Sequence, residues 1–82
     1  MVWYVYILRC NNGSYYTGIT NNLAQRIAEH NSAKGARYTR TRRPVTLIYQ
    51  EKYSDKSTAL KREIVVKDMS RGRKEDLVKK VR

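Results

Sequence analysis

The sequence predicts a small α+β domain in which a three-stranded, mainly antiparallel sheet is flanked by helices. Three observations support this class: β-patterned runs near the start and the middle of the chain, a turn signal between the first two runs, and capped helical segments after the second and third. The predicted order is β-β-α-β-α-α. Because 82 residues can bury only one modest core, we expect residues 1–82 to form a single domain.

The first two strands are predicted to form a hairpin. Residues 2–9 place apolar side chains on both faces, which is typical of a strand that is covered on both sides. Residues 15–20 form the return strand. The segment Asn11-Asn12-Gly13-Ser14 between them is a turn signal.

The length of this turn decides which tyrosines share a face of the sheet. A three-residue loop with Gly13 in the left-handed conformation sets Tyr6 opposite Gly18. In that register Tyr6 and Tyr16 lie on the same face, whereas a two-residue turn would place them on opposite faces. We predict the three-residue loop. Gly18, which has no side chain, would then leave space beside Tyr6 for a backbone or a phosphate.

Three helices and a third strand complete the predicted fold. Asn22, followed three residues later by Gln25, resembles a capping box and opens a helix that runs to about residue 31. A basic loop at 34–44 leads to the third strand at 45–53. A helix capped by Ser54 or Asp55 then runs to about residue 68, and the last helix begins at Ser70 or Arg71.

The first helix carries two candidate site residues, Arg26 and His30. At about 100° per residue, its apolar arc comprises Leu23, Ala24, Ile27 and Ala28. Arg26 lies at the edge of this arc, where it either follows the apolar surface or directs its guanidinium at a phosphate. His30 lies beside the arc. This single histidine is either a buried structural residue or a group that hydrogen-bonds a tyrosine or relays a proton.

The helix after the third strand places a carboxylate among apolar residues. Its apolar arc is predicted to comprise Ala59, Leu60, Ile64 and Val66. Glu63 projects from the middle of that arc, where an uncompensated charge would be costly. Its partner is therefore a cation: Lys67, Arg26 or a divalent metal ion. A single carboxylate suits Mg²⁺, and the lack of Cys/His clusters argues against zinc.

The chain is strongly basic. It has 18 Lys and Arg residues against 7 Asp and Glu, a net charge of +11 that favours a polyanionic partner. Cations and one aromatic ring concentrate in the loop at 34–44, a composition suited to backbone phosphates and one stacked base. The candidate nucleic-acid contacts are Lys34, Arg37, Tyr38, Arg40, Arg42 and Arg43.

The single cysteine, Cys10, excludes an intramolecular disulfide and is expected to be a buried thiol in a reducing compartment. The apolar run at 2–8 is much shorter than the roughly 20 residues that span a bilayer. It also lacks the basic flank and the cleavage site of a signal peptide. We therefore expect a soluble, cytoplasmic protein.

Together these residues resemble the GIY-YIG nuclease domain. Val5-Tyr6 matches the end of the first motif triplet, and Tyr16-Thr17-Gly18 matches the second. Residues 22–26 are similar to the helix motif with its arginine, and residues 59–63 to the later helix with its glutamate. The similarity spans nearly the whole chain. It is strongest with the small stand-alone bacterial members, whose segments resemble Gly-Ser-Tyr-Tyr-Thr-Gly-Ile-Thr, His-Asn-Ser and Lys-Gly-Ala-Arg-Tyr-Thr-Arg of this chain.

The resemblance implies a metal-dependent endonuclease that hydrolyses phosphodiester bonds in DNA, branched or damaged DNA included, with DNA favoured over RNA. It implies that Glu63 holds one Mg²⁺ or Mn²⁺ and that Arg26 neutralises the scissile phosphate. Tyr6 or Tyr16 would accept a proton from the attacking water, with His30 orienting or relaying. Because a free tyrosine has a pKa of about 10, ionising it at pH 7 costs about 4 kcal/mol. Nearby positive charge must reduce that cost.

Two other functions stay open on the residues alone. A nucleic-acid-binding module of the same fold, with little or no cleavage, would account for the net charge and the basic loop. A basic component of a ribonucleoprotein would account for the charge but not for Glu63. The presence of both Glu63 and Arg26 favours catalysis, and a protein partner that supplies specificity is compatible with so small a domain.

Overall fold

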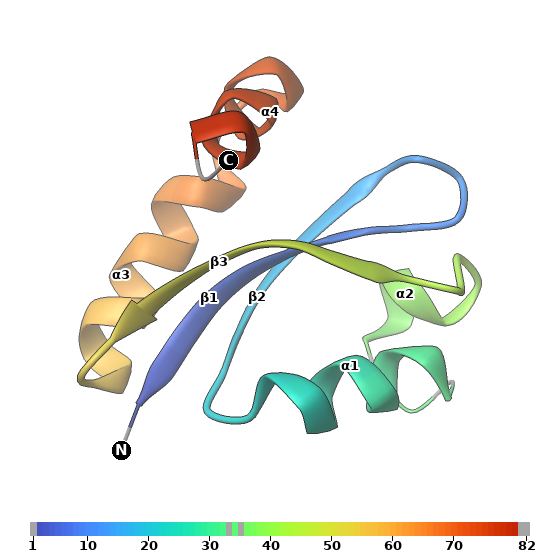
Figure 1. Cartoon of the computed structure of the whole chain (residues 1–82), viewed down its shortest axis with the longest axis horizontal. Coiled ribbons are helices and arrows are strands. Elements are labelled where there is room, and N and C mark those ends of the chain that lie inside the picture. Colours follow the sequence, from blue (N-terminus) through green and yellow to red (C-terminus); the bar gives the residue numbers. More distant parts are fainter. Residues whose placement is uncertain (1, 33, 35, 81–82) are drawn as a thin grey trace.

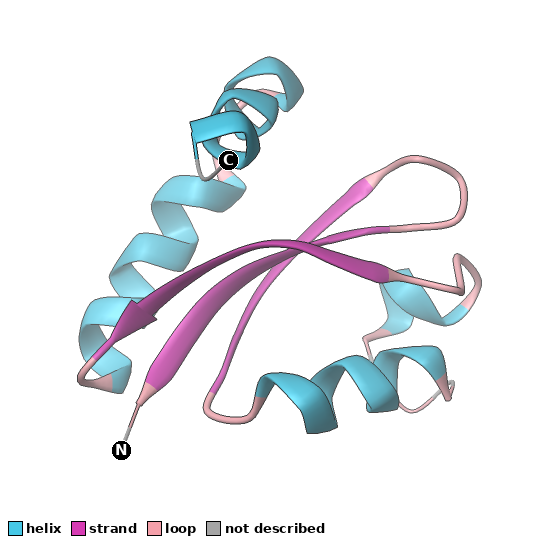
Figure 2. Cartoon of the chain, viewed as in Figure 1, coloured by secondary structure: helices cyan, strands magenta, loops and turns pink. Residues whose placement is uncertain are grey.

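The computed structural model describes residues 2–32, 34 and 36–80, which form three strands and four helices (Figures 1 and 2). The strands are β1 (Trp3–Arg9), β2 (Tyr15–Thr20) and β3 (Thr46–Tyr53), and the helices are α1 (Leu23–Asn31), α2 (Arg37–Arg40), α3 (Lys56–Lys67) and α4 (Arg71–Lys80). The predicted fold class is confirmed. No helix in the described part of the chain is long and apolar enough to cross a membrane.

The sheet is antiparallel throughout, in the order β2-β1-β3, so β1 is the central strand. Four consecutive residues of β1 are buried, from Val5 to Leu8, which confirms that both of its faces are covered. In Figure 1 the strongly twisted sheet separates α1 and α2 from α3 and α4. The candidate site is therefore framed by two helical layers.

The hairpin between β1 and β2 has the predicted three-residue loop. Cys10 N–H donates to the Ser14 carbonyl at 2.8 Å, and Gly13, at φ +86°, is left-handed. Tyr6 pairs with Gly18 as predicted. The space at Gly18 is not left open, however, because the Tyr6 ring itself occupies it.

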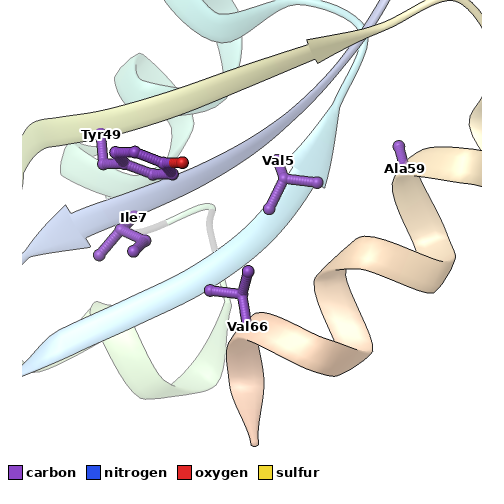
Figure 3. Packing of buried hydrophobic residues seen from close by; sticks show 5 residues of the cluster. All are labelled: Val5, Ile7, Tyr49, Ala59 and Val66. Atoms are coloured by element: carbon purple, nitrogen blue, oxygen red, sulfur yellow. The ribbon is translucent and has the colours of Figure 1, made fainter. Parts of the chain in front are cut away.

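Each face of the sheet has its own core. The core shared with α3 consists of Val5, Ile7, Tyr49, Ala59 and Val66 (Figure 3). The core on the opposite face consists of Tyr6, Leu8, Cys10 and Val45, against which Tyr16, Leu23, Ile27 and Leu47 pack. Cys10 is buried, as expected for its thiol. Since alternate residues of β1 point to opposite faces, one strand organises both cores.

The predicted helix starts are confirmed by their caps. The Asn22 side chain accepts a hydrogen bond from Gln25 N–H at 3.1 Å at the start of α1. The Asp55 side chain accepts one from Thr58 N–H at 3.1 Å at the start of α3. Each cap satisfies a backbone donor that the first helical turn leaves unpaired.

The predicted apolar arcs of α1 and α3 are wrong in part. Ala24 and Ala28 are exposed on α1, whose inward face also carries two polar side chains. On α3, Leu60 and Ile64 are 40% and 68% exposed. The reason is that α3 packs on the sheet through two small contacts, Ala59 and Val66, with paired polar side chains between them.

The predicted basic loop contains the short helix α2 instead of being irregular throughout. Gly35, within the predicted loop, lies outside the described residues. Tertiary contacts hold the rest of this segment. Asn11 N–H donates to the Arg42 carbonyl at 2.9 Å, and the Asn31 side chain bonds both backbone groups of Val45, at 2.7 and 3.2 Å. The basic segment is thus attached to the hairpin loop and to the end of α1.

Candidate active site

Tyr6 and Tyr16 lie side by side on the face of the sheet that α1 covers. Their ring centroids are 6.5 Å apart, which confirms the shared face that the loop length predicts. Tyr6 is 1% exposed, whereas Tyr16 is only partly buried. A Cβ atom at position 18 would lie 2.5 Å from the Tyr6 hydroxyl oxygen, so the ring position depends on glycine. The two tyrosines therefore have different access to a substrate.

The inward face of α1 directs Arg26 and His30 toward these tyrosines. Leu23, Arg26, Ile27 and His30 share that face at the helical spacing of three and four residues. His30 has no exposed surface. The Arg26 guanidinium is about a third exposed, pairs with Glu29 at 3.1 Å and lies near the Tyr6 hydroxyl.

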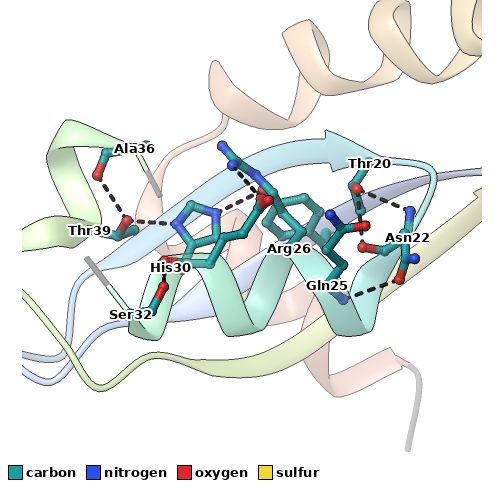
Figure 4. A network of polar contacts seen from close by, with 10 residues as sticks. Thr20, Asn22, Gln25, Arg26, His30, Ser32, Ala36 and Thr39 are labelled. Carbon is teal, nitrogen blue, oxygen red and sulfur yellow. Dashed lines mark hydrogen bonds and ion pairs between the residues drawn. The ribbon is translucent and has the colours of Figure 1, made fainter. Parts of the chain in front are cut away.

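His30 is hydrogen-bonded through both ring nitrogens. Its Nε2 lies 3.1 Å from the Tyr6 hydroxyl, and its Nδ1 lies 2.6 Å from the Thr39 hydroxyl on α2. The Thr39 hydroxyl in turn donates to the Ala36 carbonyl at 3.0 Å (Figure 4). The His30 ring also packs edge-on against Tyr16, with centroids 5.2 Å apart. Both readings of His30 hold, since it is buried and also bonds a tyrosine.

Burial and the Arg26 charge control the ionisation of this cluster. Burial raises the pKa of Tyr6, although hydrogen bonding from Arg26 opposes the change. Burial and then the Arg26 charge lower the pKa of His30, against a smaller effect of Glu29. The neutral forms of Tyr6 and His30 are therefore both favoured.

Glu63 lies on the other helical layer. Helix α3 packs against β1 and β2. Burial is the main cause that raises the pKa of Tyr6, and the Glu63 charge adds to the rise. The Glu63 side chain is 15% exposed and pairs with Lys67 at 3.3 Å. One predicted partner, Lys67, is thus confirmed.

A divalent metal ion bound at Glu63 would have one carboxylate ligand. Among residues 2–32, 34 and 36–80, no three His, Cys, Asp or Glu side chains come together as a ligand cluster. Glu63 alone fits a hard cation such as Mg²⁺, which commonly takes one or two carboxylates and retains several waters. The donor chemistry does not fit a structural zinc site, which uses four Cys or His ligands.

The predicted nucleic-acid contacts divide into two groups. Arg42 donates to the Tyr38 carbonyl at 2.7 Å, and Arg43 donates to the carbonyls of Arg40 and Asn31 at 2.9 and 3.2 Å. These two arginines stabilise their own segment. Within the described residues, the side chains of Lys34, Arg37 and Arg40 are exposed and have no protein partner.

Tyr38 already has two ring partners. Its ring lies 6.0 Å from that of Tyr16, nearly parallel at 25°, and the Arg42 guanidinium lies over it at 4.0 Å from the centroid. A stacked base would compete with these partners. The contact between Tyr38 and Tyr16 connects the basic segment to the site.

Sequence reasoning missed Thr39, which is fully buried against His30. Thr39 is one of two threonines among four arginines of the same segment, and it gave no signal because a short basic segment has no periodicity that marks an inward-facing residue. It also missed the ion pair of Arg62 with Glu51 at 2.9 Å, which joins α3 to β3. Only the packed fold brings these groups together.

The fold and its candidate residues define a class: a small α+β domain with two tyrosines on adjacent strands, an arginine on the helix that covers them and a glutamate on a second helix. The chain belongs to the GIY-YIG family, since the family model of the GIY-YIG catalytic domain matches residues 2–76. That family implies a nucleic-acid substrate and nuclease chemistry.

More particularly, the chain is similar to UPF0213 proteins. It is 60% identical over 78 residues to one of Desulfotalea psychrophila, covering 94% of this chain and 71% of that protein. It is 56% identical to one of Staphylococcus haemolyticus, with 87% of each chain covered. The solution structure of a UPF0213 protein from Bacillus halodurans matches with a TM-score of 0.62 at 47% identity, over 96% of this chain and 84% of that one. A protein from E. faecalis matches with a TM-score of 0.68 at 42% identity, over 99% and 86%.

Proposed function

We propose that this chain is a metal-dependent endonuclease that hydrolyses phosphodiester bonds in DNA. The observation that carries the proposal is the placement of Arg26 beside Tyr6 and Tyr16 on one face of the sheet, next to a segment with exposed arginines. Phosphodiester hydrolysis needs a cation at the phosphate, a base for the water and charge neutralisation. The three requirements have candidates from three different elements of this fold.

Arg26 is the candidate for the phosphate contact. Its guanidinium is about a third exposed, so it can reach a bound strand while it stays near the Tyr6 hydroxyl. A guanidinium offers several donors in a planar fork that matches phosphate oxygens. Arg26 would therefore both bind the scissile phosphate and stabilise the charge that develops on it.

Tyr16 is the better candidate for the base. Tyr6 is buried, its hydroxyl is hydrogen-bonded to His30, and burial raises its pKa. Tyr16 is partly exposed on the same face. As a phenolate, Tyr16 would take the proton of the attacking water, while Tyr6 holds Arg26 in place.

Glu63 is the candidate metal ligand, with Mg²⁺ or Mn²⁺ as the ion. When bound, such an ion supplies Lewis-acid stabilisation of a phosphoryl oxygen. Glu63 itself would exchange its Lys67 partner for the ion, which its partial exposure permits. Its low exposure on a helix that packs against β1 and β2 supports this role.

A cleavage assay with Mg²⁺ or Mn²⁺ tests the proposal. We expect Glu63→Gln and Tyr16→Phe each to lower kcat by about 10²-fold or more, while DNA binding is retained. Glu75→Gln is a matched control, because Glu75 is an ion-paired glutamate on α4 that lies outside the site. Full activity of Glu63→Gln would overturn the mechanism, and a larger loss in Tyr6→Phe than in Tyr16→Phe would reassign the base.

A second candidate function is nucleic-acid binding with little or no cleavage. The net charge of +11 supports binding without catalysis, and the Lys67 ammonium already neutralises Glu63. A Mn²⁺ titration followed by NMR distinguishes the two. Selective broadening of amide signals near Glu63, Tyr6 and Tyr16 supports the endonuclease, and uniform spectra support the binding module.

A further inference from the structure

A buried chain of hydrogen bonds connects α2 to Tyr6, whose hydroxyl lies near the Arg26 guanidinium. It begins at the Ala36 carbonyl, passes through the Thr39 hydroxyl at 3.0 Å and reaches His30 Nδ1 at 2.6 Å (Figure 4). From His30 Nε2 it continues to the Tyr6 hydroxyl at 3.1 Å, where it ends. Thr39 and His30 have no exposed surface, and Tyr6 is 1% exposed. Water cannot easily substitute for any of these partners.

The Ala36 carbonyl at one end and the Arg26 cation near the other end fix the direction of the chain, because a carbonyl oxygen can only accept and a guanidinium can only donate. In one arrangement alone every hydrogen of the chain has an acceptor. Tyr6 donates to Nε2 of His30, Nδ1–H of His30 donates to Thr39, and Thr39 donates to the Ala36 carbonyl. The Tyr6 oxygen then stays able to accept from the nearby Arg26. In the opposite direction the Tyr6 hydrogen would point at the Arg26 cation and have no acceptor.

We propose that Thr39 is a positioning residue that holds His30 in its Nδ1–H tautomer and thereby keeps the Tyr6 oxygen as an acceptor for Arg26. Thr39 acts through other residues and touches no reacting atom. The proposal rests on the proposed function for its catalytic consequence only, because the tautomer is a property of the folded protein. The observation that supports this proposal is the contact between the buried Thr39 hydroxyl and the buried His30 ring.

Removing the hydroxyl of Thr39 has a defined consequence. Thr39→Val keeps the shape of the side chain but leaves Nδ1–H of His30 without an acceptor in a site closed to solvent. An unsatisfied buried donor is costly, so the ring would move its proton to Nε2. The Tyr6 oxygen would then accept from His30, and its own hydrogen would face Arg26. The guanidinium would lose the partner that orients it toward the phosphate.

The tautomer can be read directly, because the chain has one histidine and gives one set of imidazole signals. Long-range ¹H–¹⁵N correlation spectra distinguish a protonated Nδ1 from a protonated Nε2. We expect the Nδ1–H tautomer in the unaltered protein and in Thr39→Ser, which keeps a hydroxyl, and the Nε2–H tautomer in Thr39→Val. Thr41→Val is the matched control, since Thr41 is exposed at the end of the same helix and should leave the tautomer unchanged.

Cleavage provides the second measurement. We expect Thr39→Val to lower kcat by about 10- to 100-fold with little change in KM, Thr39→Ser to restore most of the activity and Thr41→Val to be unaffected. An Nε2–H tautomer in the unaltered protein, or an unchanged tautomer in a folded Thr39→Val, overturns the proposal. If Thr39→Val does not fold, the unaltered protein and Thr39→Ser still decide the tautomer. Activity that survives Glu63→Gln would overturn the proposed metal mechanism and leave the tautomer result standing.

Discussion

At the scale of single residues, the hydroxyl of Thr17 is buried at a position where the described part of the chain offers it no hydrogen bond. Its side chain is 3% exposed, and among the described residues its oxygen is the buried side-chain polar atom without a hydrogen-bond partner. Such an atom costs about 1–3 kcal/mol. We expect Thr17→Val, which keeps the shape and removes the hydroxyl, to raise the free energy of unfolding by about 1 kcal/mol, measured by urea denaturation.

Thr20 on the same strand is the matched control for Thr17. It is also buried, but its hydroxyl donates to the Asn22 carbonyl at 3.2 Å and accepts from Asn22 N–H at 3.1 Å. Thr20→Val should therefore lower the free energy of unfolding by about 1 kcal/mol. If the two substitutions changed stability in the same direction, the unpaired hydroxyl would not be what distinguishes Thr17.

Substituting Gly18 tests whether the buried position of the Tyr6 ring requires a residue without a side chain at position 18. In Gly18→Ala the new Cβ would lie 2.5 and 2.7 Å from the hydroxyl oxygen and Cζ of Tyr6, so the buried ring must move. We expect a loss of about 1–3 kcal/mol in stability, as for other overpacked cores, together with loss of cleavage. Gly72→Ala on α4 is the control, because nothing lies within 4 Å of its Cβ, and its stability should be unchanged or slightly raised. Equal effects of the two alanines would contradict the close approach at Gly18.

At the scale of elements, an ion-pair network holds α3 to β3 and so places Glu63. The Glu51 carboxylate accepts from Arg62 Nε and Nη2 at 2.9 and 3.0 Å, from Tyr53 at 2.6 Å and from Tyr49. Burial alone would raise the pKa of Glu51, but the hydrogen bonds outweigh it and lower the pKa. Burial and Glu51 raise the pKa of Tyr49 to about 12. Since Arg62 precedes Glu63 on the helix, this network fixes the orientation of the candidate ligand.

Breaking the network should destabilise the fold in a pH-dependent way. We expect Arg62→Met to lower the free energy of unfolding by about 1–3 kcal/mol at pH 7, because Glu51 loses two charged hydrogen bonds. A lowered folded-state pKa means that this stabilisation is present above the unfolded-state pKa of about 4.3 and is lost as the pH falls through the folded-state value. The difference between the two proteins, measured by urea denaturation, should therefore shrink in acid. Lys61→Met, at an exposed position of α3, is the control. A difference independent of pH would contradict the role of Glu51.

Local signals explain which elements could be predicted from the sequence. Gly13 and the Asn22 cap determine the hairpin loop and the start of α1 through contacts within a few residues, so both predictions are confirmed. The buried face of α3 could be predicted only in part. Ala59, Glu63 and Val66 face inward as predicted, whereas Arg62 faces inward because its partner Glu51 lies on β3. Helix α2 has four residues and is held by Thr39 and Arg42 contacts, which leave no periodicity in the sequence.

At the scale of the whole molecule, the charge and the site are arranged so that a bound polyanion would lie across α2. The basic segment contacts the site through two links: Tyr38 stacks on Tyr16, and Thr39 bonds His30. The exposed cations Arg37 and Arg40 belong to the same short helix. A strand held by these arginines would therefore be kept next to the tyrosine pair, so binding and positioning depend on one element.

The salt dependence of DNA binding tests where the strand lies. Each phosphate contact releases counterions, so losing one contact should reduce the slope of log K against log salt concentration by about 1. We expect this reduction for Arg37→Ala and for Arg40→Ala, whose side chains are free of protein partners within the described chain. Lys79→Ala is the matched control, because it removes the same charge from an exposed position of α4, which Figure 1 shows on the opposite side of the sheet from α2. If the phosphate contacts are made by α2, Lys79→Ala should leave the slope unchanged. Equal reductions in all three variants would mean that net charge alone attracts the DNA, and α2 would then not be the binding element.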